Sequence, residues 1–477
     1  MDASRRRTWT LVTVSLATFM TYLDNNIVNV AIPAIQRDLH LSASRLEWVV
    51  SGYILVFAAL LLAGGRLADA YGRKRLFLLG LGIFTAASLL AGLAGSADLL
   101  IVARALQGLG AALVTPTTLA IISASYRDPR ERAAAVGIWT AVGAAALAVG
   151  PLLGGLLSQH ASWEWIFYVN VPLGLGTLAL ATRTITESRE VQAKRLDLPG
   201  LSLSALALTA LTWALIQGGS RGWTDHAILG SFGVALVAGV VFVLVEAGTR
   251  DAMVDVSLFR DRVFSGGIVA LMLWAFGLFG IYFFTSIYLQ EVLGFDATTA
   301  GLAFVPMASA MIIAAIVSES LGRRIGEHRL VAGALLAMGG GIASVALLGA
   351  HTGFASLMPS LVVIGISGGL TTPLTASVLS AMPADRAGVA SGLFNASREV
   401  AGLLGITIIG AVLSAREAAR VRAGADPLTA YLSGYRLGLV LAGVLVAVGG
   451  VAAYGALRGT RVRVPDTLEG LSVPELA

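Results

Sequence analysis

The stretch TFMTYLDNNIVNVAIPAI, residues 18–35, decides the fold. It is long enough and apolar enough at both ends to cross a bilayer, yet Asp24, Asn25, Asn26 and Asn29 lie near its middle. A carboxylate at the centre of a membrane helix costs about 2.5–3.5 kcal/mol on insertion scales, so such residues usually face a cavity and have a function. Asp24 is therefore interpreted as a functional residue. A purely structural hydrogen bond to a neighbouring helix is the alternative.

The composition indicates a membrane protein. Of 477 residues, 56% are hydrophobic and only 13% are charged, whereas soluble domains are typically about 25% charged. The 56 glycines fit helices that pack closely through small side chains. The chain has no cysteine, which excludes disulfides, thiolate metal sites and cysteine nucleophiles.

Runs of about 20 apolar residues predict fourteen membrane-spanning helices, the ninth long enough to tilt or kink. The first run is too long for a signal peptide and has no small-residue cleavage site before Asp24. The expected spans are 9–36, 46–64, 76–96, 98–123, 133–158, 163–182, 198–217, 227–247, 264–290, 298–318, 329–349, 354–380, 387–413 and 435–457.

The basic residues sort by membrane side. With a cytoplasmic N-terminus, 24 of the 33 Lys and Arg residues lie in cytoplasmic segments, 7 lie in outer loops, and Arg104 and Arg398 lie within spans. Because Lys and Arg concentrate on the cytoplasmic side, both termini are expected inside. The net charge of +5 therefore does not indicate a nucleic-acid-binding face. The long outer loop expected at 414–434 carries several arginines against this rule and has no assigned role.

An internal repeat relates the two halves of the chain. GLGAALVTPTT at 108–118 recurs as GISGGLTTPLT at 365–375, and GIWTAVGAAALAVG at 137–150 recurs as GLFNASREVAGLLG at 392–405. These pieces recur in order at nearly one offset, which favours a true repeat over chance similarity between Gly/Ala/Leu-rich helices. The predicted fold is an all-α membrane protein with two parallel six-helix bundles and two inserted helices. The expected divisions are an N-terminal bundle at 1–183, a linker with the inserted helices at 184–260, and a C-terminal bundle with a cytoplasmic tail at 261–477.

Four motifs in order resemble the major facilitator superfamily, in its fourteen-helix drug:proton antiporter branch. The resemblance covers nearly the whole chain. It implies a bacterial cytoplasmic-membrane transporter, not an enzyme, that exports amphipathic, often cationic drugs, dyes or antibiotics in exchange for protons. The motifs are LDNNIVNVAIP (23–33) in the first helix, GRLADAYGRKR (65–75) in the loop between helices 2 and 3, ARALQGLGAA (103–112) in the fourth helix, and GAAALAVGPLLGGLL (143–157), the antiporter motif of the fifth helix.

Four ionisable residues are expected to couple transport to protons: Asp24, Arg104, Arg398 and Glu399. A carboxyl group kept from water holds a proton more readily, so Asp24 is expected to load and release one near neutral pH. Arg104 needs a counter-charge or a cavity within the membrane, and the resemblance implies a part in proton transfer. Glu399 departs from the family pattern of Arg followed by an uncharged polar residue. It is either a second site for a proton or a cation, or it only neutralises Arg398.

The substrate site is expected between aromatic and polar walls, which suit loose selectivity. Asn26 stands where the family usually has Thr and shares a helix face with Asn29. For both residues, a structural hydrogen bond to a neighbouring helix and a contact with substrate are equally good interpretations. The expected substrate-binding residues are Asp24, Asn26, Tyr22, Trp139, Asn170, Phe394 and Asn395.

Gly65, Asp69, Gly72 and Arg73 form the expected conformational latch in the loop 65–75. The resemblance implies that this latch closes the cytoplasmic side in the outward-facing state. In the fainter second copy of the loop, 319–330, Glu319 and Arg323 take the positions of Gly65 and Asp69. That copy is expected to be weak or to have reversed polarity.

The antiporter motif leaves one face of the fifth span nearly free of side chains. Its glycines allow close packing or a bend, and its proline removes a backbone donor. The resemblance marks this motif as one of exporters. Its residues are Gly143, Gly150, Pro151, Gly154 and Gly155.

Other functions fit the sequence less well. A dedicated exporter of a single self-made metabolite or antibiotic stays open, and a proton-coupled importer is disfavoured by the glycine-rich fifth span. An ATP-driven pump would need a GxxxxGK[ST] loop, which does not occur, and the five histidines are too dispersed for a metal site. The expected energy source is the proton gradient, with no cofactor. The expected partners are a small-molecule substrate, protons and membrane lipid, and the protein is expected to be a monomer.

Overall fold

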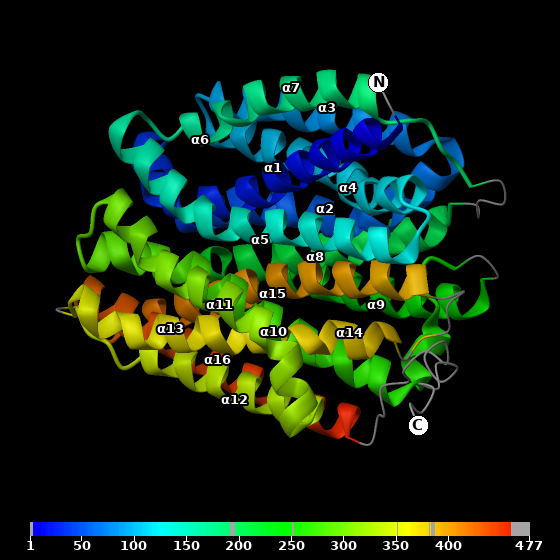
Figure 1. The fold of residues 1–477 in the computed structure, drawn as a ribbon. Helices are drawn as coiled ribbons and strands as arrows, with labels where there is room; N and C mark the ends of the chain where they lie inside the picture. Colours follow the sequence, from blue (N-terminus) through cyan, green and yellow to red (C-terminus); the bar gives the residue numbers. More distant parts are fainter. Residues whose placement is uncertain are drawn as a thin grey trace.

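The computed structural model describes residues 3–190, 196–249, 252–350, 352–380, 382 and 387–458. The expected cytoplasmic tail after 458 lies outside these residues. Every regular element in the described part of the chain is a helix (Figure 1). The helices are α1 (Ala3–Asp38), α2 (Ala43–Tyr71), α3 (Arg73–Gly92), α4 (Ala97–Ser125), α5 (Pro129–His160), α6 (Trp165–Tyr168), α7 (Asn170–Thr184), α8 (Leu198–Arg221), α9 (His226–Gly248), the 3₁₀ turn η1 (Val256–Arg260), α10 (Arg262–Ile287), the π-helical turn η2 (Tyr288–Val292), α11 (Ala297–Ile325), α12 (Glu327–Val345), α13 (Phe354–Leu370), α14 (Thr372–Ser380), α15 (Ala387–Arg422) and α16 (Pro427–Leu457).

The predicted all-α membrane fold is confirmed. Thirteen helical segments of the described chain are long and apolar enough to cross a membrane. The remaining predicted span is the first, α1, whose polar middle from Asp24 to Asn29 lowers its hydropathy. The sixth predicted span is divided into α6 and α7, the ninth ends in the π-helical turn η2, and the twelfth is divided into α13 and α14.

The predicted long outer loop at 414–434 is wrong. The helix α15 continues to Arg422 and α16 begins at Pro427, so only four residues connect them. Ala, Arg and Glu, which favour helix, make up most of the extension of α15. Gly424 adopts a φ of 84°, and Asp426 accepts a hydrogen bond from the Thr429 amide at 3.0 Å, which starts the next helix.

Short polar side chains begin many of the helices. An aspartate or serine before the first turn accepts hydrogen bonds from backbone amides that have no partner within the helix. Such caps fix where each helix begins and so where each connecting turn lies. The capping residues are Ser42, Ser96, Asp128, Asp197, Asp225, Asp261, Asp296 and Asp426.

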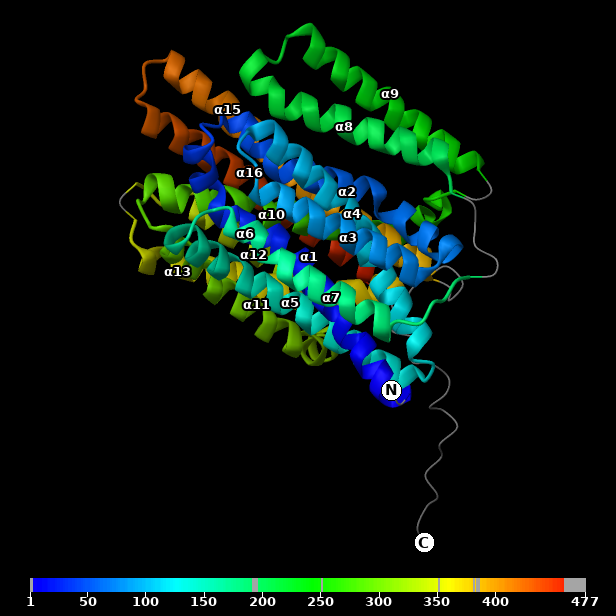
Figure 2. The same ribbon diagram turned by 90° about the horizontal axis from the view of Figure 1, so that it is seen from above.

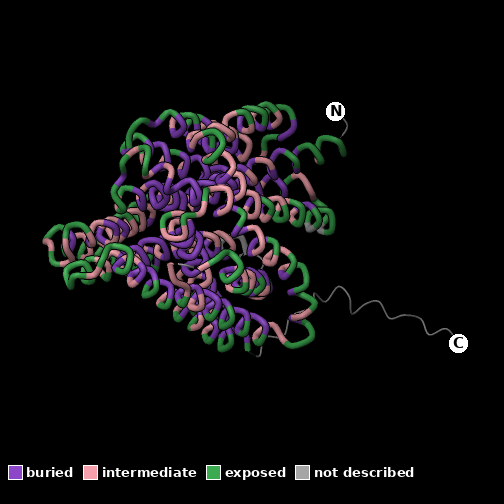
Figure 3. Tube along the Cα trace, turned by 90° about the vertical axis from the view of Figure 1, so that its left-hand side faces the viewer, coloured by how far each residue is buried: buried purple, intermediate pink, exposed green. Residues whose placement is uncertain are grey.

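Two bundles lie one above the other in Figure 1, α1–α7 over α10–α16. They meet mainly through two helix pairs, α2 with α15 and α5 with α11. Buried residues concentrate in the interior, and exposed residues follow the outer surface (Figure 3). We call the end that carries the N-terminus, Gly72 and the end of α16 the N-terminal face. The end that carries the α1–α2 and α15–α16 turns is the opposite face.

Glycine contacts confirm the internal repeat. A Cβ at Gly108 of α4 would lie 2.4 Å from the carbonyl oxygen of Tyr53 on α2, and one at Gly365 of α13 would lie 2.1 Å from that of Met307 on α11. Both positions therefore require glycine for the same reason, because the helix backbones touch there. The turns before α3 and α12 also agree, since Gly72 and Gly326 have φ values of 111° and 90°.

The inserted helices α8 and α9 pack against each other at the edge of the molecule (Figure 2). Of the two, α8 lies against α2 and α15, and so covers one seam between the bundles. Residues along α9 such as Leu236, Val237 and Leu244 are more than 60% exposed, as expected of a surface in contact with lipid.

Candidate functional site

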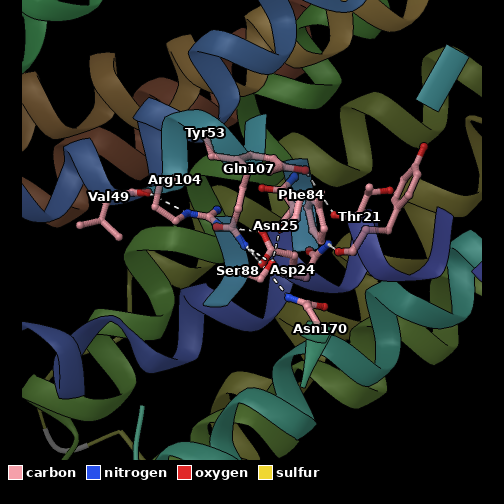
Figure 4. A network of polar contacts seen from close by, with 12 residues as sticks. Thr21, Asp24, Asn25, Val49, Tyr53, Phe84, Ser88, Arg104, Gln107 and Asn170 are labelled. Atoms are coloured by element: carbon pink, nitrogen blue, oxygen red, sulfur yellow. Dashed lines mark hydrogen bonds and ion pairs between the residues drawn. The ribbon is translucent and has the colours of Figure 1, made fainter. Parts of the chain in front are cut away.

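Asp24 lies in a closed polar network inside the N-terminal bundle (Figure 4). Its Oδ2 accepts a hydrogen bond from Arg104 Nη1 at 2.5 Å. Its Oδ1 accepts from Gln107 Nε2 at 2.9 Å and from Asn170 Nδ2 at 3.0 Å. The side chains of Asp24 and Arg104 have no exposed surface. The carboxylate thus joins α1 to α4 and α7 without contact with water.

The Arg104 guanidinium is held from several sides. Its Nε donates to the Val49 carbonyl oxygen at 3.1 Å, and its Cζ lies 4.5 Å from the centre of the Tyr53 ring. Gln107, whose Nε2 also donates to Ser88 Oγ at 2.8 Å, extends the network to α3. Arg104 Nη2 and Asn170 Oδ1 are buried without a hydrogen-bond partner among the described residues. The network therefore leaves two buried polar atoms unsatisfied, which is uncommon in a protein interior.

A cavity of about 70 Å³ lies between the two bundles, next to this network. Asn25, Asn26 and Asn29 of α1 form one wall, and Trp274 and Tyr282 of α10 face them. Asn26 and Asn29 donate their side-chain amides to carbonyl oxygens one turn earlier on α1, those of Tyr22 and Asn25. The oxygen of the Asn29 side chain has no partner within the described residues. The cavity thus offers amide groups and aromatic faces together.

Arg398 and Glu399 line the same cavity from α15. Arg398 Nη2 donates to Glu399 Oε1 at 2.7 Å and to the Tyr22 hydroxyl at 3.2 Å. Glu399 is almost fully buried, and its Oε2 has no partner among the described residues. Neighbouring side chains on a helix diverge by about 100°, yet here the flexible arginine folds back onto the carboxylate. The pair joins the C-terminal bundle to α1 through Tyr22.

A second cavity, of about 570 Å³, lies between the bundles toward the N-terminal face. Tyr22 lines both cavities, and Trp139 and Asn395 line only this one. Trp139 Nε1 donates to Thr18 Oγ1 at 2.6 Å, and Asn395 Nδ2 donates to the Ser391 carbonyl oxygen at 2.9 Å. Tyr22 therefore lies between the central cavity and this second cavity.

Three expected substrate-binding residues line neither of these cavities. Asp24 and Asn170 bond to each other within the N-terminal bundle, and Phe394 is buried on α15. The sequence prediction did not include Asn25, Trp274, Tyr282 or Met311, all of which line the central cavity. Trp274 and Tyr282 are eight residues apart, which places them on one helix face. Only the packing of the two bundles shows that this face borders the cavity.

The latch residues lie at the N-terminal face. Arg73 Nη2 donates to Asp69 Oδ1 at 2.8 Å, and the Arg73 and Glu190 backbone amides bond to the carbonyl oxygens of Ser188 and Asp69. Glu187 accepts hydrogen bonds from the backbone amides of Lys74 and Arg75, a carboxylate at the start of α3 where the helix dipole favours it. The loop 65–75 is therefore bonded to the segment after α7.

The second copy of the loop also contains an ion pair between residues one turn apart, but at the positions of Gly65 and Asp69 in the first copy. Arg323 Nη1 donates to Glu319 Oε1 at 2.9 Å, one turn apart, as Arg73 and Asp69 are. Both side chains of the second pair are mostly exposed, whereas Arg73 is 17% exposed. An ion pair that faces water contributes little, so the pair in the first copy is expected to be the stronger of the two.

The antiporter motif forms contacts within and between the bundles. A Cβ at Gly150 or Gly154 would meet α1, at 2.8 Å from Asn26 Cβ and 2.4 Å from the Ile27 carbonyl oxygen. Gly143 also faces α1, with Thr18 Cγ2 at 3.6 Å. At Gly155 the Cβ would lie 2.2 Å from the Ala297 carbonyl oxygen at the start of α11, in the other bundle. Likewise, a Cβ at Gly301 of α11 would lie 2.3 Å from the Pro151 carbonyl oxygen.

Contacts between the bundles close the opposite face. The Thr298 amide at the start of α11 donates to Gln159 Oε1 at 3.0 Å, near the end of α5. Gln290 Nε2 donates to the Val30 carbonyl oxygen at 2.9 Å, which joins η2 to α1. The described residues therefore form an arrangement that is tightly packed at the opposite face and contains a cavity toward the N-terminal face.

Comparison with known proteins gives relatives for the chain. Residues 14–406 match the family described as the Major Facilitator Superfamily. The chain is 37% identical over 414 residues to "Multidrug resistance protein Stp" of Mycobacterium tuberculosis (strain CDC 1551 / Oshkosh), which covers 86% of this chain and 77% of that protein. It is 36% identical over 420 residues to "Puromycin resistance protein pur8" of Streptomyces alboniger, which covers 87% and 83%.

Two further relatives extend the comparison. The chain is 34% identical over 417 residues to "Tetracenomycin C resistance and export protein" of Streptomyces glaucescens, which covers 86% of this chain and 77% of that protein. Among solved structures, it resembles a bacterial homologue of the human lysosomal transporter Spinster in an inward-facing, unoccupied conformation. The TM-score is 0.65 at 18% identity, with 95% of this chain and 97% of that chain covered. This last similarity concerns the fold.

Proposed function

Because the chain belongs to the major facilitator superfamily, whose members are transporters rather than enzymes, we propose that it is a proton-coupled antiporter. It exports amphipathic, often cationic small molecules across a bacterial cytoplasmic membrane. The observation that carries the proposal is a pair of arginine–carboxylate contacts beside the central cavity. Arg104 with Asp24 belongs to the N-terminal bundle, and Arg398 with Glu399 belongs to the C-terminal bundle.

Asp24 is the proposed coupling residue. Its ionised carboxylate holds Arg104 and Gln107 of α4 and Asn170 of α7 at once. A proton on Asp24 removes the charge to which these donors are directed, so protonation changes how three helices pack. Asp24 lines neither described cavity, and we therefore assign it to proton coupling alone.

Glu399 is the proposed meeting point of proton and substrate. Its Oε2 is free of protein partners among the described residues, and its side chain lines the central cavity. A cationic substrate and a proton would compete for this carboxylate, which is the requirement for exchange of one for the other. The aromatic rings of Trp274 and Tyr282 and the three asparagines supply the remaining contacts.

The proposed orientation places the N-terminal face in the cytoplasm, in line with the positive charge of its loops. The described arrangement is then inward-facing. The proton gradient supplies about 2.3 kcal/mol per charge per 100 mV and about 1.4 kcal/mol per pH unit, which is sufficient to concentrate a substrate outside.

The test is dye transport in vesicles with the purified protein and an imposed proton gradient. Ethidium movement by the unsubstituted protein, lost in Asp24→Asn and in Glu399→Gln at equal protein levels, supports the proposal. Ethidium movement that ignores the gradient would refute proton coupling. Movement of substrate in the same direction as the protons would identify an importer.

A dedicated exporter of one antibiotic is the second candidate. Relatives named for puromycin and for tetracenomycin C favour it. So does the small central cavity with its three amide side chains, which suit directed hydrogen bonds. If a panel of dyes leaves the proton flux unchanged while one antibiotic raises it, the dedicated function is the correct one.

A further inference from the structure

Glu47 is a buried carboxyl group at the contact between the two bundles. It lies in α2 near the opposite face and is 7% exposed. A Cβ at Gly410 of α15 would lie 2.4 Å from its Oε1, so the carboxyl group rests directly on the backbone of the other bundle. Its Oε2 is buried and has no hydrogen-bond partner within the described residues.

The surroundings of Glu47 offer no described counter-charge. It packs where α2 meets α15, with α8 against both helices (Figure 2). The charged side chains of these elements near the opposite face make their contacts elsewhere or carry the same charge as Glu47. Arg45 of α2 pairs with Asp98, and Arg221 of α8 lies over Trp213. On α15, Arg416 and Arg420 bond to Ser433, Arg422 bonds to the Ala418 carbonyl oxygen, and Glu417 is itself acidic.

The seam that contains Glu47 leads into the central cavity. Val50 and Ile54 follow Glu47 on the same face of α2, and Ile406 and Glu399 precede Gly410 on the same face of α15. All four of these residues line the cavity. Separation of α2 from α15 at the opposite face would therefore expose Glu47 and open the cavity in one movement.

A carboxyl group in this place is stable only without its charge. A buried carboxylate that lacks both a cation and hydrogen-bond donors is strongly disfavoured, whereas the neutral acid is tolerated. Water at an opened seam would reverse this preference.

We propose that Glu47 is a proton-binding site in the gate of the opposite face: it holds a proton while α2 packs on α15 and releases it to water when the gate opens. This inference rests on the alternating access of the proposed function. Under this proposal, Glu47 takes up one proton from the outer side each time the gate closes. By linkage, each unit of outer pH changes the ratio of open to closed gate by up to about tenfold between the two titration points.

The absence of cysteine from the sequence makes the test direct. In Val50→Cys, a membrane-impermeant maleimide added to intact cells reports how often the cavity opens to the outside. In Ala43→Cys, at the exposed start of α2, the same reagent reports how pH alters the thiol itself. The labelling rate of Val50→Cys divided by that of Ala43→Cys should rise steeply with outer pH. With Glu47→Gln, the ratio should stay low and nearly constant.

Two further variants control the experiment. Asp98→Asn removes a mostly exposed carboxylate at the same face and should keep the original pH response. Glu47→Asp retains an ionisable group and should also respond to pH, which protects the test against a folding defect in Glu47→Gln. An unchanged pH response in Glu47→Gln would overturn the proposal, as would a flat response in the protein with Glu47 intact.

The outcome is independent of dye transport. Labelling needs neither substrate nor an imposed gradient. A pH-dependent gate together with ethidium movement that ignores the gradient would refute the proposed antiport and leave the Glu47 site in place. Gradient-driven transport with a pH-independent gate would support the antiport and refute the Glu47 site.

Discussion

Arg104 Nη1 lies 2.5 Å from Asp24 Oδ2, and neither side chain has any exposed surface. The two residues are 80 positions apart in the sequence and belong to α1 and α4. A buried ion pair contributes little net stability, but removal of one partner leaves a buried charge uncompensated, which typically costs about 3–5 kcal/mol. The contact therefore links the charge of Asp24 to the integrity of the N-terminal bundle.

Asp24→Asn should abolish gradient-driven transport and lower the free energy of unfolding by about 3–5 kcal/mol, because Arg104 keeps its charge without a partner. The double variant Asp24→Asn/Arg104→Gln should recover much of the stability but no transport. Thermal unfolding in detergent and vesicle transport measure the two effects separately. Arg7→Gln, which breaks the exposed pair with Glu131, should change stability by less than about 1 kcal/mol. Normal transport by Asp24→Asn would show that Asp24 is only structural.

Glu399→Gln should stop proton-driven export, while substrate exchange without a gradient continues with a lower affinity for a cationic substrate. The glutamine keeps the shape of the cavity wall and a hydrogen-bond acceptor for Arg398, but it binds no proton. Counterflow of labelled substrate, measured beside proton-driven uptake into inverted vesicles, separates the two activities. Glu417→Gln, on the same helix and outside both described cavities, serves as the matched control. Loss of both activities in Glu399→Gln would indicate a role in substrate binding alone.

The membrane spans and the repeat were predictable because each depends on local or periodic features. Hydrophobic runs mark helices, and Gly108 and Gly365 recur where backbones touch. The partners of polar residues were not predictable, because Asn170 meets Asp24 only when α7 packs against α1. The glutamate at position 47 gave no signal in the sequence either. It begins an ordinary apolar span, and its burial depends on Gly410 in the other half.

The glycines of α5 should differ sharply in their tolerance of alanine. In Gly155→Ala, the new methyl group meets the backbone of α11, so the bundles must separate at the opposite face. We expect the free energy of unfolding to fall by about 1–3 kcal/mol, because an overpacked contact forces the backbones to shift. Transport should be severely reduced. Gly137→Ala, on the same helix with no neighbouring atom within 4 Å, should be neutral or stabilising by up to about 1 kcal/mol.

Thermal unfolding and dye transport of the two alanine variants provide the comparison. Gly154→Ala adds a third case, in which the methyl group meets α1 within the same bundle. It should lower stability as Gly155→Ala does. If Gly155→Ala kept full transport, the contact between α5 and α11 would not belong to the gate.

The latch should affect transport far more than stability. Asp69→Asn removes the charge that Arg73 contacts at 2.8 Å, but the Asp69 side chain is 42% exposed. A partly exposed pair of this kind contributes up to about 1 kcal/mol, so unfolding should change little. The other bundle offers the control Glu319→Gln, which breaks the exposed pair with Arg323 in the second copy of the loop. Transport should fall several-fold in Asp69→Asn and stay near normal in Glu319→Gln. Equal effects of the two variants would show that both copies act as latches, and no effect of either would remove the latch function from this loop.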